Sequence, residues 1–242
     1  MAVQFTTNGD SLANATNATF FSTSTAPQSI NVWINALWDG NVKTSSYVGM
    51  YNGVGGPSAI QFGSKQGSPA GQCDIWTWGG GVLVSTTGVV IPSNTWVNLC
   101  YTYDGTTHRL YYNGVLNNTG TTAQIVGNFN QVFLNGYTTG VTNETATFQV
   151  DTYYYYNRVL SADEIATIHS ARGNRHGIVY GSLLRYEFDE GVQGATVTSI
   201  RNQTTYPLPV SDLVSNSART PTVTYSPGAV SSNLRVPLGC NG

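Results

Sequence analysis

Short runs of alternating apolar and polar residues, separated by turn dipeptides, fill the first 160 residues of the chain. Residues two apart in a strand share a face, so this alternation is typical of strands with one buried side. The turn signals are Asn8-Gly9, Asp39-Gly40, Asn52-Gly53, Gly79-Gly80-Gly81, Asp104-Gly105, Asn113-Gly114 and Asn135-Gly136. No helical pattern interrupts the series. The pattern therefore predicts an antiparallel sandwich or barrel.

The clearest pair of strands lies in WVNLCYTYDGTTHRLYYNGVLNN, residues 96–118. One face of its first strand is apolar and carries Val97, Leu99, Tyr101 and Tyr103. The alternate positions are polar, which predicts that the other face is at least partly in contact with water. Asn113-Gly114 is a favoured two-residue hairpin turn, because both positions tolerate positive φ.

One segment, LSADEIATIHSARG, has the pattern of a helix over about residues 162–170. Ser161 can cap the first turn while Glu164 reaches back to it, which forms a capping box. An apolar stripe and a stop signal complete the pattern: Ile165, Ile168 and Gly173. A single short helix on an all-β chain predicts a lid or a corner, not a second domain.

The composition changes near residue 204, which divides the chain into two parts. Residues 1–203 are predicted to form one sandwich, whose closing strand is expected at about 181–190. Residues 204–242 are rich in Pro and small polar residues with isolated apolar ones. Repeated Pro argues against a central strand. We expect an extended C-terminal arm that lies on another surface, either of its own domain or of a neighbour.

Charged residues make up only 9% of the chain, against about 25% in an ordinary soluble domain. Three explanations fit: a surface covered in an assembly, a polar neutral binding module, or the compositional bias of the source organism. The net charge of −2 and the lack of a basic run argue against nucleic acid as a partner. No apolar run reaches the roughly 18–20 residues of a membrane span, and MAVQFTTNGD lacks the pattern of a signal peptide. The three cysteines have no metal-site spacing, and free thiols are expected.

The segment 96–118 resembles the strand–turn–strand of laminin-G-like domains in the concanavalin A-like lectin/glucanase superfamily, which read as a Trp, an apolar strand, Asp-Gly, an apolar pair and Asn-Gly. DTYYYYNRVLSADEIATIHS, from Asp151, resembles the closing strand and helix of that family. SINVWINALW fits the strand that bears the family's tryptophan, at Trp33. RYEFDEGVQG, from Arg185, resembles its Phe-Asp-Glu-Gly strand. The resemblance covers about residues 1–200 and implies a concanavalin A-like antiparallel jelly-roll β-sandwich.

The order of the segments departs from the family in one respect. In the usual arrangement the Phe-Asp-Glu-Gly strand comes first, whereas here it follows the helix. The sandwich is therefore expected to close with a C-terminal strand in place of an N-terminal one. Chain ends in such folds lie near each other, so a permutation of this kind costs little.

The carboxylates of RYEFDEG raise the question of catalysis. Related sandwich glycosidases place three carboxylates at alternating positions of one strand, so that all three face the cleft. Glu187 and Asp189 satisfy this alternation, and Glu190 points to the opposite face. The third position falls on Gly191 or, after a bulge, Val192. The trio is incomplete, and we expect no enzymatic activity.

Four aromatic residues are candidates for carbohydrate binding. Trp76 and Trp78 share a face if DIWTW is a strand, and they could form a stacking platform. Under the resemblance, Tyr154 and Tyr156 take the face that is polar in relatives. The alternative is that these aromatics cover a second layer, such as the arm or a neighbouring molecule, and this alternative is the favoured one.

Calcium binds near one rim of the sandwich in many members of this family. Its ligands here would come from four loop residues: Asp39, Asn41, Asn143 and Glu144. No compact Asp-x-Asp run is present, and Asp and Asn in loops more often form turns. We therefore expect no cofactor, with a structural Ca²⁺ as the open alternative.

A jelly roll hosts many functions, so two hypotheses stay open. The first is a non-enzymatic structural, decoration or tail-associated protein of a virus or phage particle, which contacts neighbouring virion proteins or copies of itself through the arm. The second is a carbohydrate-binding module, acting as an adhesin or receptor-binding domain on a host-surface glycan. Both can hold on one particle. A laminarinase-type hydrolase would need the missing carboxylate trio.

Overall fold

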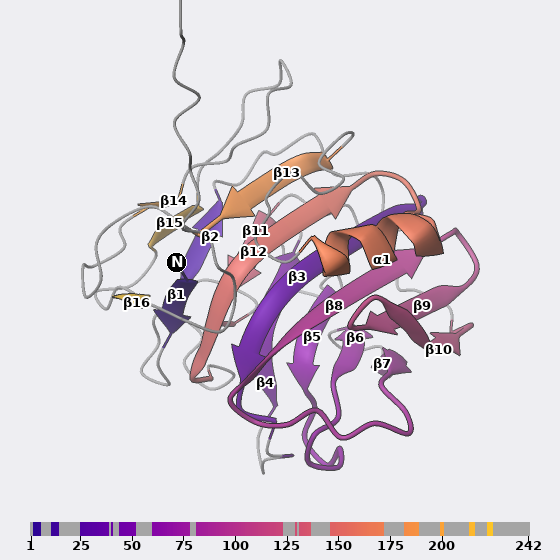
Figure 1. The fold of residues 1–242 in the computed structure, drawn as a ribbon, viewed down its shortest axis with the longest axis horizontal. Coiled ribbons are helices and arrows are strands. Elements are labelled where there is room, and N and C mark those ends of the chain that lie inside the picture. Colours follow the sequence, from indigo (N-terminus) through magenta and orange to yellow (C-terminus); the bar gives the residue numbers. More distant parts are fainter. Residues whose placement is uncertain are drawn as a thin grey trace, which may run out of the picture.

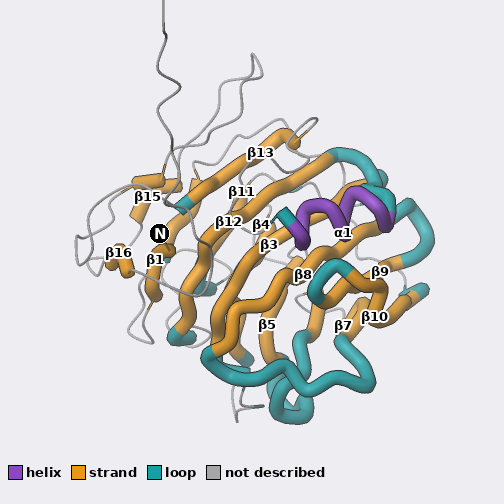
Figure 2. The backbone as a smooth tube through the Cα atoms, in the orientation of Figure 1, coloured by secondary structure: helices purple, strands orange, loops and turns teal. Residues whose placement is uncertain are grey.

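The computed structural model describes residues 2–5, 11–14, 25–38, 40, 44–51, 60–77, 81–122, 129, 131–136, 146–171, 182–188, 199–200, 213–215 and 222–224. These residues form two antiparallel sheets that face each other, with one helix on the outer side of one sheet (Figure 1, Figure 2). The all-β prediction is confirmed.

The first sheet runs in the order β10-β9-β8-β3-β12-β1-β16, and β13 also pairs with β12. Its strands are β10 Val115–Gly120, β9 His108–Tyr112, β8 Thr95–Tyr103, β3 Gln28–Ala36, β12 Phe148–Tyr156, β1 Ala2–Phe5, β16 Thr222–Thr224 and β13 Ser182–Glu187. The second sheet runs in the order β14-β15-β2-β11-β4-β5-β6-β7. Its strands are β14 Ser199–Ile200, β15 Leu213–Ser215, β2 Leu12–Asn14, β11 Gln131–Leu134, β4 Ser45–Tyr51, β5 Ile60–Ser64, β6 Asp74–Thr77 and β7 Gly81–Ser85.

The core lies between the sheets and takes alternate residues from each strand. In β8 it takes Val97, Leu99, Tyr101 and Tyr103, as their alternation predicts. The prediction for the other face of β8 is wrong, because Asn98, Cys100 and Thr102 are all fully buried. The side chains of Asn98 and Asn31 donate to each other's oxygens across β8 and β3, and the helix covers Cys100. A single strand cannot reveal this second buried layer, since its cover comes from elsewhere in the chain.

Two local signals are confirmed in detail. Asn113 and Gly114 have φ values of 49° and 82°, as the tight turn between β9 and β10 requires. Helix α1, Ala162–Ser170, begins with the predicted capping box, in which Ser161 and Glu164 each accept from the other's backbone N–H. The predicted stop at Gly173 lies outside the described residues. No helix in the described part of the chain is long and apolar enough to cross a membrane.

Strand β12 organises the first sheet, because it has partners along both edges. One edge pairs with β3 over the full length of β12. The other edge is shared: β1 pairs with residues 148–150 and β13 with residues 152–156. The register shifts at Asp151, whose carbonyl accepts the N–H of Phe188. Strand β13 thus fills the edge that β1 leaves open.

The described parts of the predicted arm lie on their own domain. β15 pairs with β2 in the second sheet, and β16 pairs with β1 in the first. Each pairing has three residue pairs in register. The sequence left open whether the arm lies on its own domain or on a neighbouring molecule. The described pieces lie on their own domain.

Deletion of residues 204–242 should therefore lower the free energy of unfolding. Eight cross-strand pairs, three in the first sheet and five in the second, are lost, at roughly 0.2–1 kcal/mol each. We expect a loss of about 2–4 kcal/mol in urea denaturation. Light scattering of both chains supplies the control. Unchanged stability together with a fall from oligomer to monomer would contradict this and assign the arm to contacts between molecules.

Candidate functional site

The aromatic residues proposed for carbohydrate binding are buried where the structure describes them. The exposed fractions are 3% for Trp76, 5% for Tyr154 and 0% for Tyr156. Trp78 lies outside the described residues. None of the three described rings presents an open face to solvent, and their role in sugar binding stays a prediction.

Tyr154 and Tyr156 form the floor on which the helix packs. They belong to an apolar cluster with Cys100, Tyr111, Leu160, Ile165 and Ile168. The guanidinium of Arg158 lies 5.5 Å from the centre of the Tyr156 ring and makes a two-pronged ion pair with Glu164 in the capping box. Helix α1 therefore forms the second layer over these tyrosines. The sequence had suggested the arm or a neighbouring molecule for this layer.

Glu187 is the carboxylate of RYEFDEG that the structure describes, and it is bound by side chains of its own chain. It is 2% exposed and lies on the outer face of β13. Arg185 Nε donates to its Oε1 at 2.7 Å, and Tyr154 donates its hydroxyl to the same oxygen at 3.1 Å. Burial, and then the Glu187 charge, raise the pKa of Tyr154 well above its usual value, so that the hydroxyl stays protonated as a donor. This carboxylate stabilises the sheet, while Asp189 and Glu190 lie outside the described residues.

Within the described ranges, no three His, Cys, Asp or Glu side chains come together as a metal site. The loop residues considered for calcium lie outside those ranges: Asp39, Asn41, Asn143 and Glu144. The calcium alternative is therefore still a prediction.

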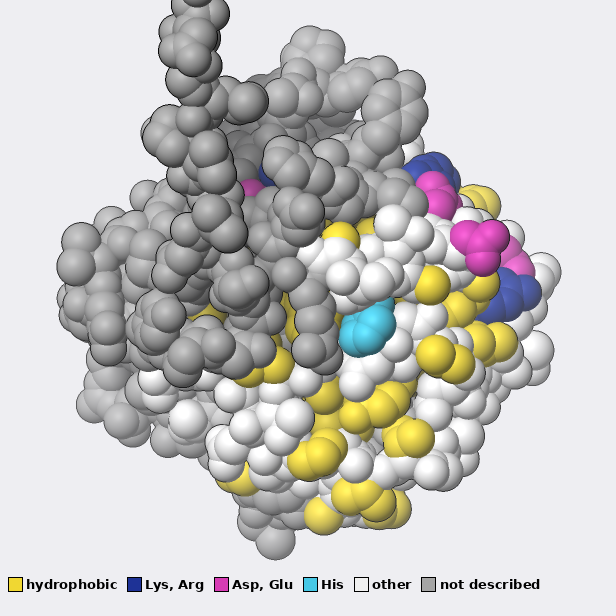
Figure 3. Space-filling view, viewed as in Figure 1, with side chains coloured by type: hydrophobic (Ala, Val, Ile, Leu, Met, Phe, Trp, Pro, Cys, Tyr) yellow, Lys and Arg dark blue, Asp and Glu magenta, His cyan; other side chains and the backbone are white. Residues whose placement is uncertain are grey.

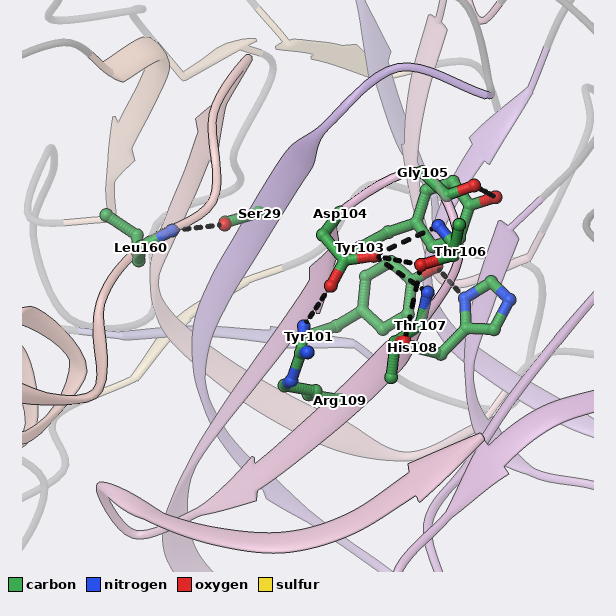
Figure 4. Close-up of polar contacts among 10 residues, drawn as sticks. All are labelled: Ser29, Tyr101, Tyr103, Asp104, Gly105, Thr106, Thr107, His108, Arg109 and Leu160. Carbon is green, nitrogen blue, oxygen red and sulfur yellow. Dashed lines mark hydrogen bonds and ion pairs between the residues drawn. The ribbon is translucent and has the colours of Figure 1, made fainter. Parts of the chain in front are cut away.

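His108 is part of a buried network at the turn between β8 and β9 (Figure 4). Its Nε2 lies 2.8 Å from the carbonyl oxygen of Thr122, which only accepts, so Nε2 carries the proton. Nδ1 then accepts from the Tyr101 hydroxyl at 2.7 Å, and the ring stacks on Tyr103. Burial lowers the pKa of His108 below its usual value. The imidazole is a neutral structural group.

The neighbouring turn is built around the carboxylate of Asp104. Its Oδ1 accepts the N–H groups of Thr106 and Thr107, and its Oδ2 accepts from Arg109 at 2.6 Å (Figure 4). These donors, Thr107 first and Arg109 second, hold the pKa of Asp104 far below its usual value. The Asp-Gly signal thus forms an Asx turn, with Gly105 at φ 101°.

Gln61 is a candidate residue that the sequence did not reveal. It lies on β5 between the core residues Ile60 and Phe62, so its side chain points to the outer face of the second sheet. Gln61 is 0% exposed, yet neither its amide nitrogen nor its amide oxygen has a hydrogen-bond partner. Isolated hydroxyls such as that of Thr102 also lack a partner. Among the described residues, only Gln61 has both amide atoms unpartnered, which costs about 1–3 kcal/mol for each group.

Trp76 lies beside Gln61 on the same face. The two residues are directly paired across β6 and β5. The indole also reaches over Gly63, two positions further along β5, where an added Cβ would lie 3.1 Å from the Trp76 Cη2 atom. That Cβ would come within 1.9 Å of the Ser45 carbonyl oxygen, so only glycine fits there. An indole and an unmatched amide are therefore placed side by side.

The sequence matches a family model described as the concanavalin A-like lectin/glucanases superfamily, of the laminin G type, over residues 6–166. The match covers more than half of the chain, so this protein belongs to that superfamily. The resemblance carried by residues 96–118 and 151–170 is thereby confirmed. No curated protein sequence matches the chain.

Solved structures share the fold but little sequence. A candidate carbohydrate-binding protein from Bacteroides ovatus aligns with a TM-score of 0.64 at 12% identity and covers 96% of this chain and 61% of that one. The binding domain of Paraclostridial Mosquitocidal Protein 1 aligns with a TM-score of 0.53 at 16% identity. The alignment covers 72% of this chain and 44% of that one. The receptor-binding domain of botulinum neurotoxin mosaic serotype C/D aligns with a TM-score of 0.53 at 13% identity. This alignment covers 72% of this chain and 43% of that one. The chain spans less than two thirds of each of these proteins, and identities this low show the fold alone.

Glu187→Ala should destabilise the protein by about 3 kcal/mol, because it leaves Arg185 without its buried counter-charge. This loss lies at the low end of the range of about 3–5 kcal/mol for a broken buried ion pair, because the Arg185 side chain is partly exposed. Asp163→Ala, at an exposed site in the first turn of α1, is the control and should cost about 0.5 kcal/mol. Urea denaturation measures both. Removal of a catalytic carboxylate usually leaves stability unchanged or raises it, so that result would contradict a structural role.

His108 should make the protein less stable as the pH falls from about 6.5, the usual pKa of histidine in an unfolded chain. Since the folded pKa is lowered, the unfolded state binds the proton first, and stability is lost until the pH passes the folded pKa. The slope is at most about 1.4 kcal/mol per pH unit. His108→Gln should flatten the curve of unfolding free energy between about pH 7 and about pH 5, from roughly half a unit above to roughly one and a half units below the usual histidine pKa. An equal slope in both proteins would assign the effect to another group.

Proposed function

We propose that this chain is a non-catalytic carbohydrate-binding module. The observation that carries the proposal is the hydrogen-bonded, charge-paired state of Glu187, the one described carboxylate on the strand where related sandwich enzymes place catalytic groups. The Glu187 carboxylate is 2% exposed and paired with Arg185 and Tyr154 of its own chain, so a glycosidic bond does not reach it in this structure. Binding is then the activity that best suits a lectin-like jelly roll. The candidate carbohydrate-binding protein that aligns over 96% of the chain supports the same class.

A role in a virus or phage particle is the second proposal. Its support is the scarcity of charge, at 9% of residues. On the face shown in Figure 3, charged side chains occur as a few neighbouring blue and magenta groups, and most of the described surface is apolar or uncharged. Such a surface suits contact with neighbouring virion proteins or copies of the chain. The solution mass measured beside the arm deletion tests self-association at the same time.

The wild-type protein should bind at least one neutral oligosaccharide without cleaving it. Isothermal titration with a panel of neutral glycans measures binding, and release of reducing ends over a day measures hydrolysis. Glu187→Gln should bind as the wild type does, because the amide still accepts the Tyr154 hydroxyl. Repetition with EDTA and with added Ca²⁺ tests the calcium alternative. New reducing ends that vanish in Glu187→Gln would contradict the proposal.

A further inference from the structure

The partly exposed residues of four neighbouring strands of the first sheet fall in one row. In β1, β3 and β12 every residue is buried except Gln4, Asn35 and Gln149, which are partly exposed. In β8 the partly exposed residue is Trp96, next to the exposed Thr95 at the start of the strand. Trp96 pairs directly with Asn35, and Asn35 pairs with Gln149. Gln149 in turn pairs with Gln4, so one solvent-accessible row crosses all four strands.

The row lies on the outer face of the sheet, away from helix α1. Successive side chains of a strand point to opposite faces. In β12, Phe148 and Val150 belong to the core, so Gln149 between them points outward, and the other members of the row alternate with core residues in the same way. α1 packs on Tyr154 and Tyr156, towards the other end of β12 (Figure 1). The helix therefore covers one end of this face and leaves the row accessible.

Three primary amides and one indole make up the row. The Asn35 Nδ2 donates to the Gln149 Oε1 at 3.1 Å, which links the two central amides across β3 and β12. A primary amide has two N–H donors and an acceptor, and sugar hydroxyls both donate and accept, so amides of this kind suit a chain of hydroxyls. The partly exposed indole of Trp96 offers an apolar surface to the C–H face of a sugar ring.

The strands of the row are almost free of charge. No residue of β1, β3 or β8 up to Tyr103 is Lys, Arg, His, Asp or Glu. In β12 the single acid is Asp151, which is 1% exposed. These strands therefore present no cation to pair with a carboxylate, sulfate or phosphate. A ligand that is neutral and rich in hydroxyls matches this face.

We propose that the row of Gln4, Gln149, Asn35 and Trp96 binds an extended chain of neutral hexose units laid across the strands. This inference rests on the proposed carbohydrate-binding function and assigns a site to it. Neighbouring strands lie about 4.8 Å apart, which is close to the length of one hexose unit in an extended chain. The row thus offers one side chain to each unit over about 14 Å, or three strand spacings. Affinity should rise with chain length until the row is filled.

Calorimetric titration of the full chain with neutral oligosaccharides of increasing length tests the row. The probes are cello-oligosaccharides and β-1,4-linked manno-oligosaccharides, from the disaccharide to the hexaose, with glucose and mannose as single units. For the preferred sugar, wild-type affinity should rise by about tenfold or more from the disaccharide to the tetraose, because each added unit gains hydrogen bonds. It should rise little beyond the tetraose, which fills the row.

Variants of the row should change both affinity and its dependence on chain length. Trp96→Ala and Asn35→Ala should each bind the tetraose about tenfold more weakly, since stacking or hydrogen bonds are lost. Gln4→Ala is the sharper variant, because Gln4 lies at the far end of the row from Trp96. It should abolish the gain between the trisaccharide and the tetraose and leave shorter chains unaffected. A purely structural amide would not alter the dependence on length.

Gln66→Ala is the matched control, because Gln66 is an exposed amide in the loop between β5 and β6 of the other sheet. It should leave affinity and length dependence unchanged. Urea denaturation checks the folding of each variant. Gln4→Ala removes one partly exposed amide, so its result decides the matter if Trp96→Ala is unstable.

Three results would count against the row. Wild-type affinity and length dependence in Gln4→Ala and Asn35→Ala would overturn the site and leave carbohydrate binding in place. Wild-type affinity that does not rise beyond a single unit would also overturn it, since an extended row would then not be in use. Failure of the wild type to bind any neutral oligosaccharide would overturn both proposals.

Discussion

The pairing of β12 along both of its edges is the constraint on which the first sheet depends. β3 pairs with β12 over nine residues of chain, and the opposite edge is divided between β1 and β13 at Asp151. A bulge at this position lets two strands from opposite ends of the sequence share one edge. The same strand sends Tyr153 and Tyr155 into the core and presents Tyr154 and Tyr156 to α1. A slip of one residue would exchange these two sets of tyrosines and lose both layers.

The polar groups of the first sheet's outer face connect it to the helix. The Ser29 hydroxyl on β3 accepts the Leu160 N–H (Figure 4), just before α1 begins. The same hydroxyl donates to the Arg158 carbonyl. Glu187, through Tyr154, links β13 to the tyrosines beneath the helix. Matched groups of this kind hold a buried layer in one arrangement, because each would be costly to leave unpaired. These contacts fix the position of α1 on the first sheet.

The parts of the fold that could be predicted are those whose cause is local. The capping box at Ser161 and the turn at Asn113 depend on residues a few positions apart, and both are confirmed. The burial of Asn98 could not be predicted, because its cover comes from residues far away in the sequence. Gln61 was missed for the same reason: a polar residue at an alternate strand position normally signals contact with water. Its significance comes from being buried without partners, which only the three-dimensional structure shows.

The superfamily defines a scaffold, and the function follows from how its two outer faces are used. A helix packed over apolar and charge-paired groups removes part of one face from recognition. On the second sheet, Gln61 is buried with both amide atoms unpartnered, which lowers the stability of the folded state. Natural proteins depart from full polar matching mainly at functional sites. By that argument the RYEFDEG segment is weak evidence of catalysis, because its described carboxylate, Glu187, already has its partners within the chain.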